Sequence, residues 1–152
     1  TTNTELWNGS SWTEVNNMNT SRRGLSGFGA DNTAALAFGG NPNPSSVLTA
    51  TELWNGTNWT SVNSLNTGRS SMSGAGVSTA GPAGRFATTE EWNGTNWAET
   101  SDLSLARQDM ANVLGASRAG LCAGGNAATG QSAVTEEWSN EGAPLTVTFT
   151  DS

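Results

Sequence analysis

The sequence predicts an all-β fold built from repeated units of four antiparallel strands. The first observation is a segment of the pattern Glu-x-Trp-Asn-Gly that returns along the chain, with successive first Trp residues 47, 38 and 46 residues apart. The second is that short apolar or small-residue runs alternate with turn-forming residues, and the third is that no window sustains a 3.6-residue apolar period. A period in the forties with short strands is typical of β-propeller blades. The copies are Glu5–Trp12, Glu52–Trp59, Glu90–Trp97 and the shortened Glu136–Trp138.

We expect one propeller region, made of half a blade and three further blades. The strand signals give the last two strands of a blade at the start of the chain, between Thr4 and Val15, and a final strand at Leu145–Phe149. The expected boundaries are residues 1–15 for the half blade, 22–65 for the complete blade, 69–103 for the short blade and 107–152 for the C-terminal blade.

Two hairpins account for the complete blade. The first joins Gly24–Ala30 to Thr33–Phe38 through a turn-forming Asp-Asn pair. The second joins Thr49–Trp54 to Trp59–Val62 around an Asn-Gly turn. With a four-residue loop, Trp54 and Trp59 face each other across the two strands, an arrangement that stabilises a hairpin beyond the area that it buries.

The short blade has 8 to 9 residues fewer than its neighbours. The deficit falls near Gly81–Gly84, where a second strand and a Gly pair are expected. A three-stranded blade is one reading, and a segment missing from the sequence is the other.

About three and a half blades are too few to close a ring, because propellers usually have four to eight. The half blade leaves a strand edge without a partner, and such an edge invites another strand. That strand could come from Leu145–Phe149, from an upstream blade or from a second copy of the chain. We therefore expect a homo-oligomer or a part of a longer chain.

The composition excludes several classes of function. There are 13 acidic and 6 basic side chains, a net charge of −7, and no Lys, His or Tyr. Without His there is no Ser-His-Asp or Cys-His nucleophile and no imidazole metal site, so we expect neither a cofactor nor a metal. The scarcity of cations argues against nucleic acid, and apolar runs of about five residues argue against membrane insertion. The single cysteine, Cys122, lies in an apolar run and is expected to be buried.

Repetition favours structural roles for the most conspicuous side chains. Because Trp7, Trp54 and Trp92 recur at a fixed phase, we expect them to be buried between strands rather than to stack on sugars. A Glu precedes each of these residues by two positions, and an Arg follows each by 15. A catalytic carboxylate pair is normally singular, so we expect the repeated Glu to bond to the Arg or to a neighbouring loop. The residues are Glu5, Glu52, Glu90 and Glu136, with Arg22, Arg69 and Arg107.

The order of residues within the complete unit identifies a further likeness. A Met and an Arg come first, at Met18 and Arg22, and a Gly-rich strand follows them. Next come an apolar strand that ends in Gly-Gly, at Leu36–Gly40, and then two Trp residues, Trp54 and Trp59. This order resembles the Kelch repeat, and the likeness covers nearly the whole chain. It departs from that family in having Trp-Asn-Gly in place of Tyr-Asp, and in the absence of a Gly pair from the middle repeat. The variant is similar to the Kelch-type repeats of marine bacteriophage structural proteins.

The resemblance implies where a recognition surface lies. In Kelch propellers the residue after the repeated Arg and the loop after the Gly pair tend to lie on one face of the disc. These positions are Arg23, Ser70 and Gln108, with Asn41 and Asn126 opening the variable loops. Function is expected where repeats differ, and these residues differ between repeats.

The expected function is that of a non-enzymatic virion or tail-fibre module, located on a virion or outside the cell. It would mediate assembly with other virion proteins, or adhesion to a glycan or protein of the host surface. A Kelch-type adaptor for peptides is the alternative. A glycosidase-like enzyme is a further one, since two carboxylates suffice for that chemistry.

Overall fold

The computed structural model describes residues 1–71, 73–74, 77–79, 87–113, 119–139 and 145–147. Within these ranges the chain forms strands and no helix, and the paired strands are antiparallel. The prediction of an all-β fold is therefore confirmed. None of the described residues belongs to a helix with the length and apolarity needed to cross a bilayer.

The strands form five sheets. The N-terminal sheet pairs β1 (Thr4–Trp7) with β2 (Trp12–Val15). The second sheet has the order β3 (Ser26–Asp31), β4 (Ala34–Phe38), β5 (Thr51–Trp54) and β6 (Trp59–Val62). The third contains β7 (Ser73–Gly74), β8 (Val77–Thr79), β9 (Thr89–Trp92) and β10 (Trp97–Thr100). The C-terminal sheet contains β12 (Ala111–Val113), β13 (Ala119–Ala123), β16 (Thr135–Ser139) and β17 (Leu145–Val147). A small sheet joins β11 (Arg107–Gln108), β14 (Asn126–Ala127) and β15 (Gly130–Gln131).

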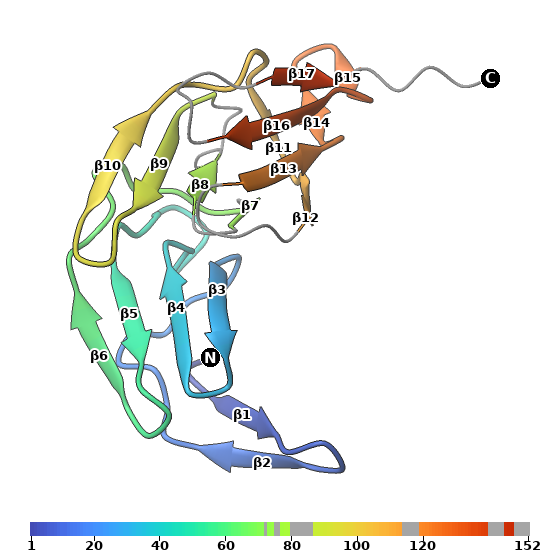
Figure 1. Cartoon of the computed structure of the whole chain (residues 1–152). Coiled ribbons are helices and arrows are strands. Elements are labelled where there is room, and N and C mark those ends of the chain that lie inside the picture. Colours follow the sequence, from blue (N-terminus) through green and yellow to red (C-terminus); the bar gives the residue numbers. More distant parts are fainter. Residues whose placement is uncertain (72, 75–76, 80–86, 114–118, 140–144, 148–152) are drawn as a thin grey trace.

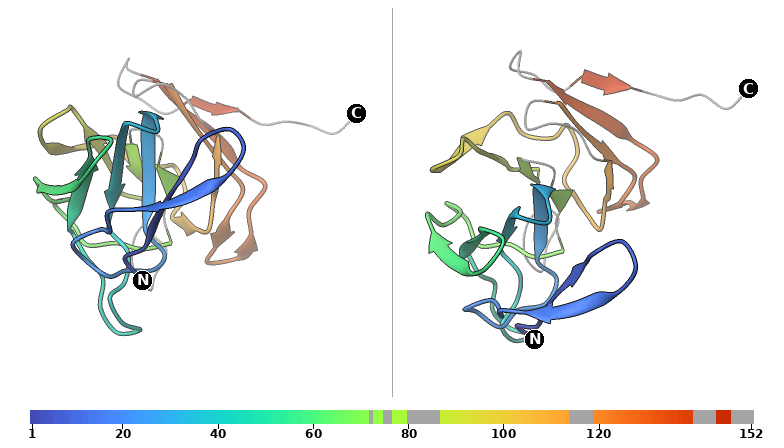
Figure 2. Two further views of the ribbon diagram at one scale, coloured as in Figure 1. Left: turned by 90° about the horizontal axis from the view of Figure 1, so that it is seen from below. Right: turned by 60° about the horizontal axis from the view of Figure 1, so that its bottom comes forward.

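The sheets follow one another along an open arc (Figure 1), which Figure 2 shows from two further directions. The first strands of three successive sheets lie on the inner side of the arc, where β7 contacts both β3 and β12. The N-terminal and C-terminal sheets lie at its two ends, and the described residues do not close a ring.

The expected strands of the complete unit are confirmed. Strands β3 and β4 form the first hairpin, and β5 and β6 form the second. Trp54 pairs with Trp59 across that second hairpin, with ring centroids 5.4 Å apart. The recurring Asn-Gly turn is closed by the Asn55 side chain, whose Oδ1 accepts the backbone N–H groups of Thr57 and Asn58, while Gly56 adopts a φ of 90°.

The shorter unit still has four strands, from β7 to β10, so the three-stranded reading is wrong. Its second strand, β8, ends before the expected gap, and Gly81–Gly84 lies outside the described residues. At the other end of the chain, β17 pairs with β16 of its own sheet. The described part of the C-terminal segment is therefore already used as a fourth strand and does not reach β1.

The best-packed part of the core lies between the second and third sheets. Phe38 is fully buried, and its ring centroid lies 4.8 Å from that of Trp97. Leu36 and Leu65 complete this cluster. A smaller cluster contains Cys122, which is 6% exposed, so the expected burial of the cysteine is confirmed.

Burial was predicted for Trp7, Trp54 and Trp92, and only Trp54 is fully buried. Trp54 is 4% exposed, and Trp92 is partly buried. The prediction is wrong for Trp7, which is 44% exposed. Trp7 belongs to the two-stranded sheet at the end of the arc, where no inner strand and no further sheet formed by the described residues covers it.

Candidate functional site

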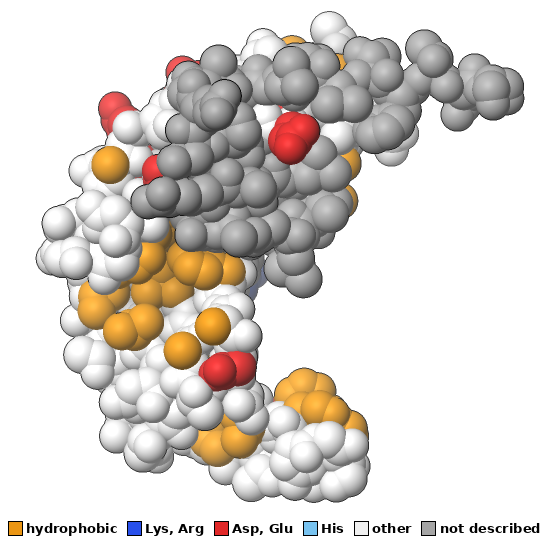
Figure 3. Space-filling model, in the orientation of Figure 1, with side chains coloured by type: hydrophobic (Ala, Val, Ile, Leu, Met, Phe, Trp, Pro, Cys, Tyr) orange, Lys and Arg blue, Asp and Glu red, His pale blue; other side chains and the backbone are white. Residues whose placement is uncertain are grey.

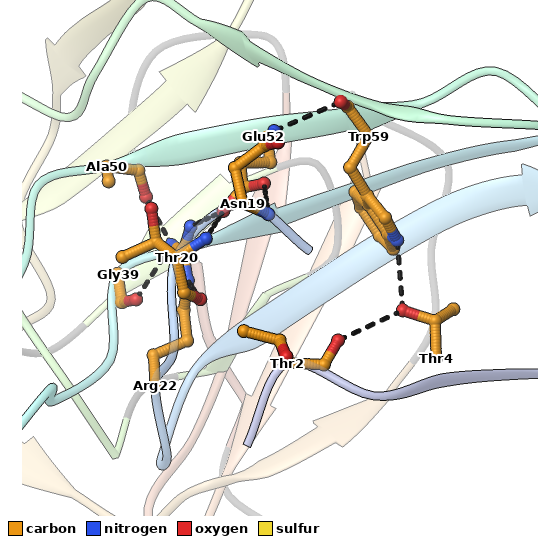
Figure 4. A network of polar contacts seen from close by, with 9 residues as sticks. All are labelled: Thr2, Thr4, Asn19, Thr20, Arg22, Gly39, Ala50, Glu52 and Trp59. Atoms are coloured by element: carbon orange, nitrogen blue, oxygen red, sulfur yellow. Dashed lines mark hydrogen bonds and ion pairs between the residues drawn. The ribbon is translucent and has the colours of Figure 1, made fainter. Parts of the chain in front are cut away.

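A buried arginine organises each complete unit. In the second sheet, Nη1 of Arg22 donates to the backbone oxygens of Gly39, at 3.1 Å, and Ala50, at 2.7 Å (Figure 4). Its Nη2 donates to the Glu52 carboxylate. One guanidinium therefore ties together the start of the unit, the end of β4 and the third strand, β5.

The paired glutamate reaches back to the linker that enters its own sheet. Glu52 accepts the backbone N–H groups of Asn19, at 2.7 Å, and Thr20, at 3.1 Å. These two residues lie between β2 and β3, so the carboxylate also fixes the connection from the preceding sheet. A carboxylate with three hydrogen-bond donors is well satisfied even when it is fully buried.

The same ion pair occurs in the next two units. Arg69 bonds to Glu90 at 2.5 Å, and Arg107 bonds to Glu136 at 2.6 Å, with every partner at most 1% exposed. Burial lowers the pKa of Arg69, and the charge of Glu90 opposes that shift. The expected bonding between repeated Arg and repeated Glu is confirmed for these pairs, which leaves their carboxylates no surface from which to act on a substrate.

The chain makes a left-handed turn two residues after each of these arginines. The positions are Gly24, Ser71 and Asp109, with φ values of 57°, 51° and 54°. Ser71 N–H donates to the Gly24 oxygen at 2.9 Å, and Asp109 N–H donates to the Ser71 oxygen at 3.4 Å. Three units therefore converge on one line of backbone hydrogen bonds. Non-glycine residues rarely adopt this conformation, and they concentrate at binding sites.

The glycine pair allows a second close approach at the same place. Arg23 and Asn41 exchange both backbone hydrogen bonds, at 3.0 and 2.8 Å. Gly40 has a φ of 93°, and a Cβ there would lie 2.8 Å from the Arg23 oxygen. Gly125 is placed in the same way against the Gln108 oxygen, at 2.7 Å. The Gly pair thus allows the loop that follows it to contact the backbone of the residue after the repeated arginine.

These contacts surround a hollow of about 360 Å³. It is lined by Arg23, Gly24, Asn41, Pro44, Ser70, Ser71 and Gln108. Four of the five residues named from the sequence are therefore brought together. The fifth, Asn126, lines a separate hollow of about 410 Å³ beside Asp109 and Gln131.

The lining of the first hollow, which we call the Arg23 hollow, offers donors and hydroxyl groups. Arg23 is exposed and makes no ion pair with any described residue, whereas the other arginines in those ranges are held in buried pairs. The Asn41 and Gln108 amides and the serine hydroxyls add both donors and acceptors. No carboxylate belongs to the described lining, so these residues supply no general acid and base pair.

Sequence reasoning missed Gly24, Pro44 and Ser71 in this lining. Gly24 and Ser71 stand at the same place after their arginines, which was a detectable signal. The left-handed backbone of Ser71 carries no such signal, because Ser is not a residue that marks this conformation.

Comparison with known proteins yields a likeness of fold. No family model and no curated protein matches the chain. Among solved structures 94 chains are similar, including the structure of YjhT, with 12% sequence identity and a TM-score of 0.75. That match covers 90% of this chain and 49% of YjhT, so the chain spans about half the length of that protein. At this identity the likeness shows the fold alone.

Proposed function

We propose that the chain is a non-enzymatic recognition module, and that its repeated sheets are blades of a Kelch-like β-propeller, about three and a half in number. The support is the internal repeat together with four-stranded antiparallel sheets that follow one another along an arc. In this proposal the Arg23 hollow is the recognition site on one face of the disc.

The observation that carries the proposal is the gathering of Arg23, Ser70 and Gln108 from three units around one hollow. These three positions are equivalent in the repeat, but their side chains differ and they share one surface. A binding face on a uniform scaffold has this property. A volume of about 360 Å³ lies at the lower end of the range for small-molecule sites. It suits one or two sugar rings or a short peptide segment.

The chemistry favours a polar ligand with an anionic or hydroxyl-rich group. Arg23 can donate two parallel hydrogen bonds to a carboxylate, and the neighbouring amides can bond hydroxyl groups. Because the chain carries a net charge of −7, an exposed guanidinium that pairs with no described carboxylate is a local exception on an acidic molecule. A glycan of a host surface, or an acidic segment of a surface or virion protein, fits these groups.

The virion or tail-fibre setting rests on the resemblance to phage Kelch-type repeats. Its test is the genetic context of the coding sequence. Neighbouring tail or capsid genes would support it, and a cullin-binding or oxidase domain in the same reading frame would contradict it.

Binding at the hollow is tested with an array of acidic and neutral glycans and the purified full chain. We expect carboxylate-bearing glycans to be retained, and Arg23→Ala to weaken that binding at least about tenfold, the usual effect of losing a charge-assisted hydrogen bond. Thr60→Ala is the control, because Thr60 is exposed on β6 and does not line the hollow. Equal binding by both variants would contradict the assignment, as would turnover of a polysaccharide by the wild-type chain.

A further inference from the structure

Strand β1 repeats strand β5 in sequence but not in surroundings. Both read Thr-Glu-Leu-Trp, at Thr4–Trp7 and Thr51–Trp54. Strand β5 lies between β4 and β6, whereas β1 pairs only with β2. One edge of β1 therefore has no partner strand among the described residues, although an identical strand in the same chain has one.

The equivalence extends to the residues before each strand. Thr1 O accepts the N–H of Arg22 at 3.3 Å, as Leu48 O accepts the N–H of Arg69 at 3.2 Å. Thr2 O accepts from Met18 as Thr49 O accepts from Leu65. The chain from Thr1 onward is thus already held as it is in a complete sheet.

Glu5 is the repeated glutamate of this incomplete sheet, and its carboxylate lacks a cation. Its counterpart Glu52 is 1% exposed and bonded to Arg22, whereas Glu5 is exposed and makes no ion pair or hydrogen bond within the described ranges. Glu5 also lies directly opposite Glu14 in the β1–β2 register. Like charges at that position destabilise a strand pair. In the third sheet Glu90 likewise lies opposite Glu99, and there Arg69 supplies the compensating cation.

An apolar hollow of about 480 Å³ lies beside the same strand. It is lined by Glu5, Leu6, Trp7 and Trp12 together with Trp54 and Trp59 of the next sheet. Trp7 is 44% exposed and Trp12 is 65% exposed, and Figure 3 shows hydrophobic side chains at the surface of this end of the arc. Apolar surface beside an open strand edge marks a place where another chain segment binds.

We propose that the free edge of β1 is a docking site for a two-stranded β-hairpin of the β3–β4 type, and that an arginine of this hairpin pairs with Glu5. The chain itself contains a hairpin that binds a Thr-Glu-Leu-Trp strand: β4 pairs with every residue of β5, from Phe38–Thr51 to Ala35–Trp54. The occupant is therefore a further repeat segment with an arginine and a glycine pair.

A second copy of this chain is the less suitable occupant. Its hairpin β3–β4 is already paired with β5, and its β7–β8 hairpin is already paired with β9. A second copy would have to open one of its own sheets to supply two strands. This inference rests on the proposal that the sheets are repeating blades, but it is independent of ligand binding at the Arg23 hollow.

The test adds a copy of residues 18–47 directly before Thr1. This extension reproduces the separation of 30 residues between Arg22 and Glu52, now between the added arginine and Glu5. We expect the amides of β1 that face the free edge to exchange with solvent much more slowly. We also expect the unfolding midpoint to rise by about 10 °C, because two added strands cover the open edge and bury apolar surface.

Two changes within the added copy form a matched pair. Arg22→Met in the copy should abolish both effects, and Arg23→Met in the copy should leave them, because the second arginine is exposed in the parent unit. An extension that leaves β1 exchange unchanged, or that acts equally with Arg22→Met, would overturn the proposal. So would a dimer of the unextended chain, measured by light scattering, that dissociates on Glu5→Gln, because the second copy would then be the occupant.

Discussion

The two identical Thr-Glu-Leu-Trp strands allow one substitution to be compared in two environments. Trp54→Ala removes a ring that is 4% exposed and whose Nε1 donates to the Asn32 oxygen at 3.0 Å. Trp7→Ala removes the same ring at the same place in the repeat, but this ring is 44% exposed. Because the local sequence is the same, a difference in cost reports the surroundings and not strand propensity.

The size of the difference follows from buried area. A Trp ring buries roughly 150–250 Å² when it is covered, and each Å² contributes about 25 cal/mol. The gap between 4% and 44% exposure then corresponds to about 1.5–2.5 kcal/mol, and the indole hydrogen bond adds about 1 kcal/mol. We expect Trp54→Ala to cost about 3–5 kcal/mol, and Trp7→Ala about 1–2 kcal/mol.

The assay is urea unfolding followed by far-UV circular dichroism, at a concentration where light scattering gives a single monomer mass. Trp12→Ala serves as an internal control, because that ring is 65% exposed and its loss should cost less than about 1 kcal/mol. If Trp7→Ala and Trp54→Ala cost the same within about 0.5 kcal/mol, burial as described here does not set the stability of these strands.

Three further outcomes are expected. Arg69→Met should destabilise the chain by about 3–5 kcal/mol in urea unfolding, since it leaves the Glu90 carboxylate buried without its cation; a cost below about 1 kcal/mol would refute this role. Gly40→Ala should cost at least about 2 kcal/mol in the same assay, because φ is 93° and the new Cβ would lie 2.8 Å from a backbone oxygen; an unchanged midpoint would show that the loop relaxes freely. The Asp31 carboxyl should titrate below its ordinary pKa of 3.8 in NMR measurements, since the hydroxyl and then the N–H of Thr33 bond its charged form. Its stabilising effect, present above the ordinary pKa, should therefore be lost as the pH falls through the lowered value, and Thr33→Val should move the pKa back towards 3.8.

Repetition in the sequence was enough to predict the strands and to expect each repeated Glu to bond to an Arg or to a neighbouring loop, and Glu52 does both. Glu52 and Arg22 recur at a fixed phase, and a charge that recurs in every unit is more simply explained by the scaffold than by one active site. Repetition failed for Trp7, because the sequence pattern records the position of a residue in its own unit and not the presence of a neighbouring strand.

The Arg23 hollow was only partly predictable. The resemblance to Kelch repeats named Arg23, Asn41 and Gln108, and the structure brings them together. The left-handed backbone of Ser71 was not predictable, because it is imposed by contacts between units, such as its hydrogen bond to Gly24, rather than by a local residue preference.

The bond from Glu52 to the linker before its own sheet has a consequence for how such an array grows. The distance from each repeated Glu to the next repeated Arg is 17 residues throughout, whereas the distance from Arg to Glu within a unit is 30, 21 and 29 residues. Differences in length between units therefore lie between the Arg and the Glu of one unit, and the number of residues from each Glu to the next Arg is constant. A gene duplication that copies one period carries with it the arginine and the carboxylate that clamp the incoming linker. Each new unit therefore contains the residues that fix its connection to the preceding unit, and the array can lengthen without any change to the units already present.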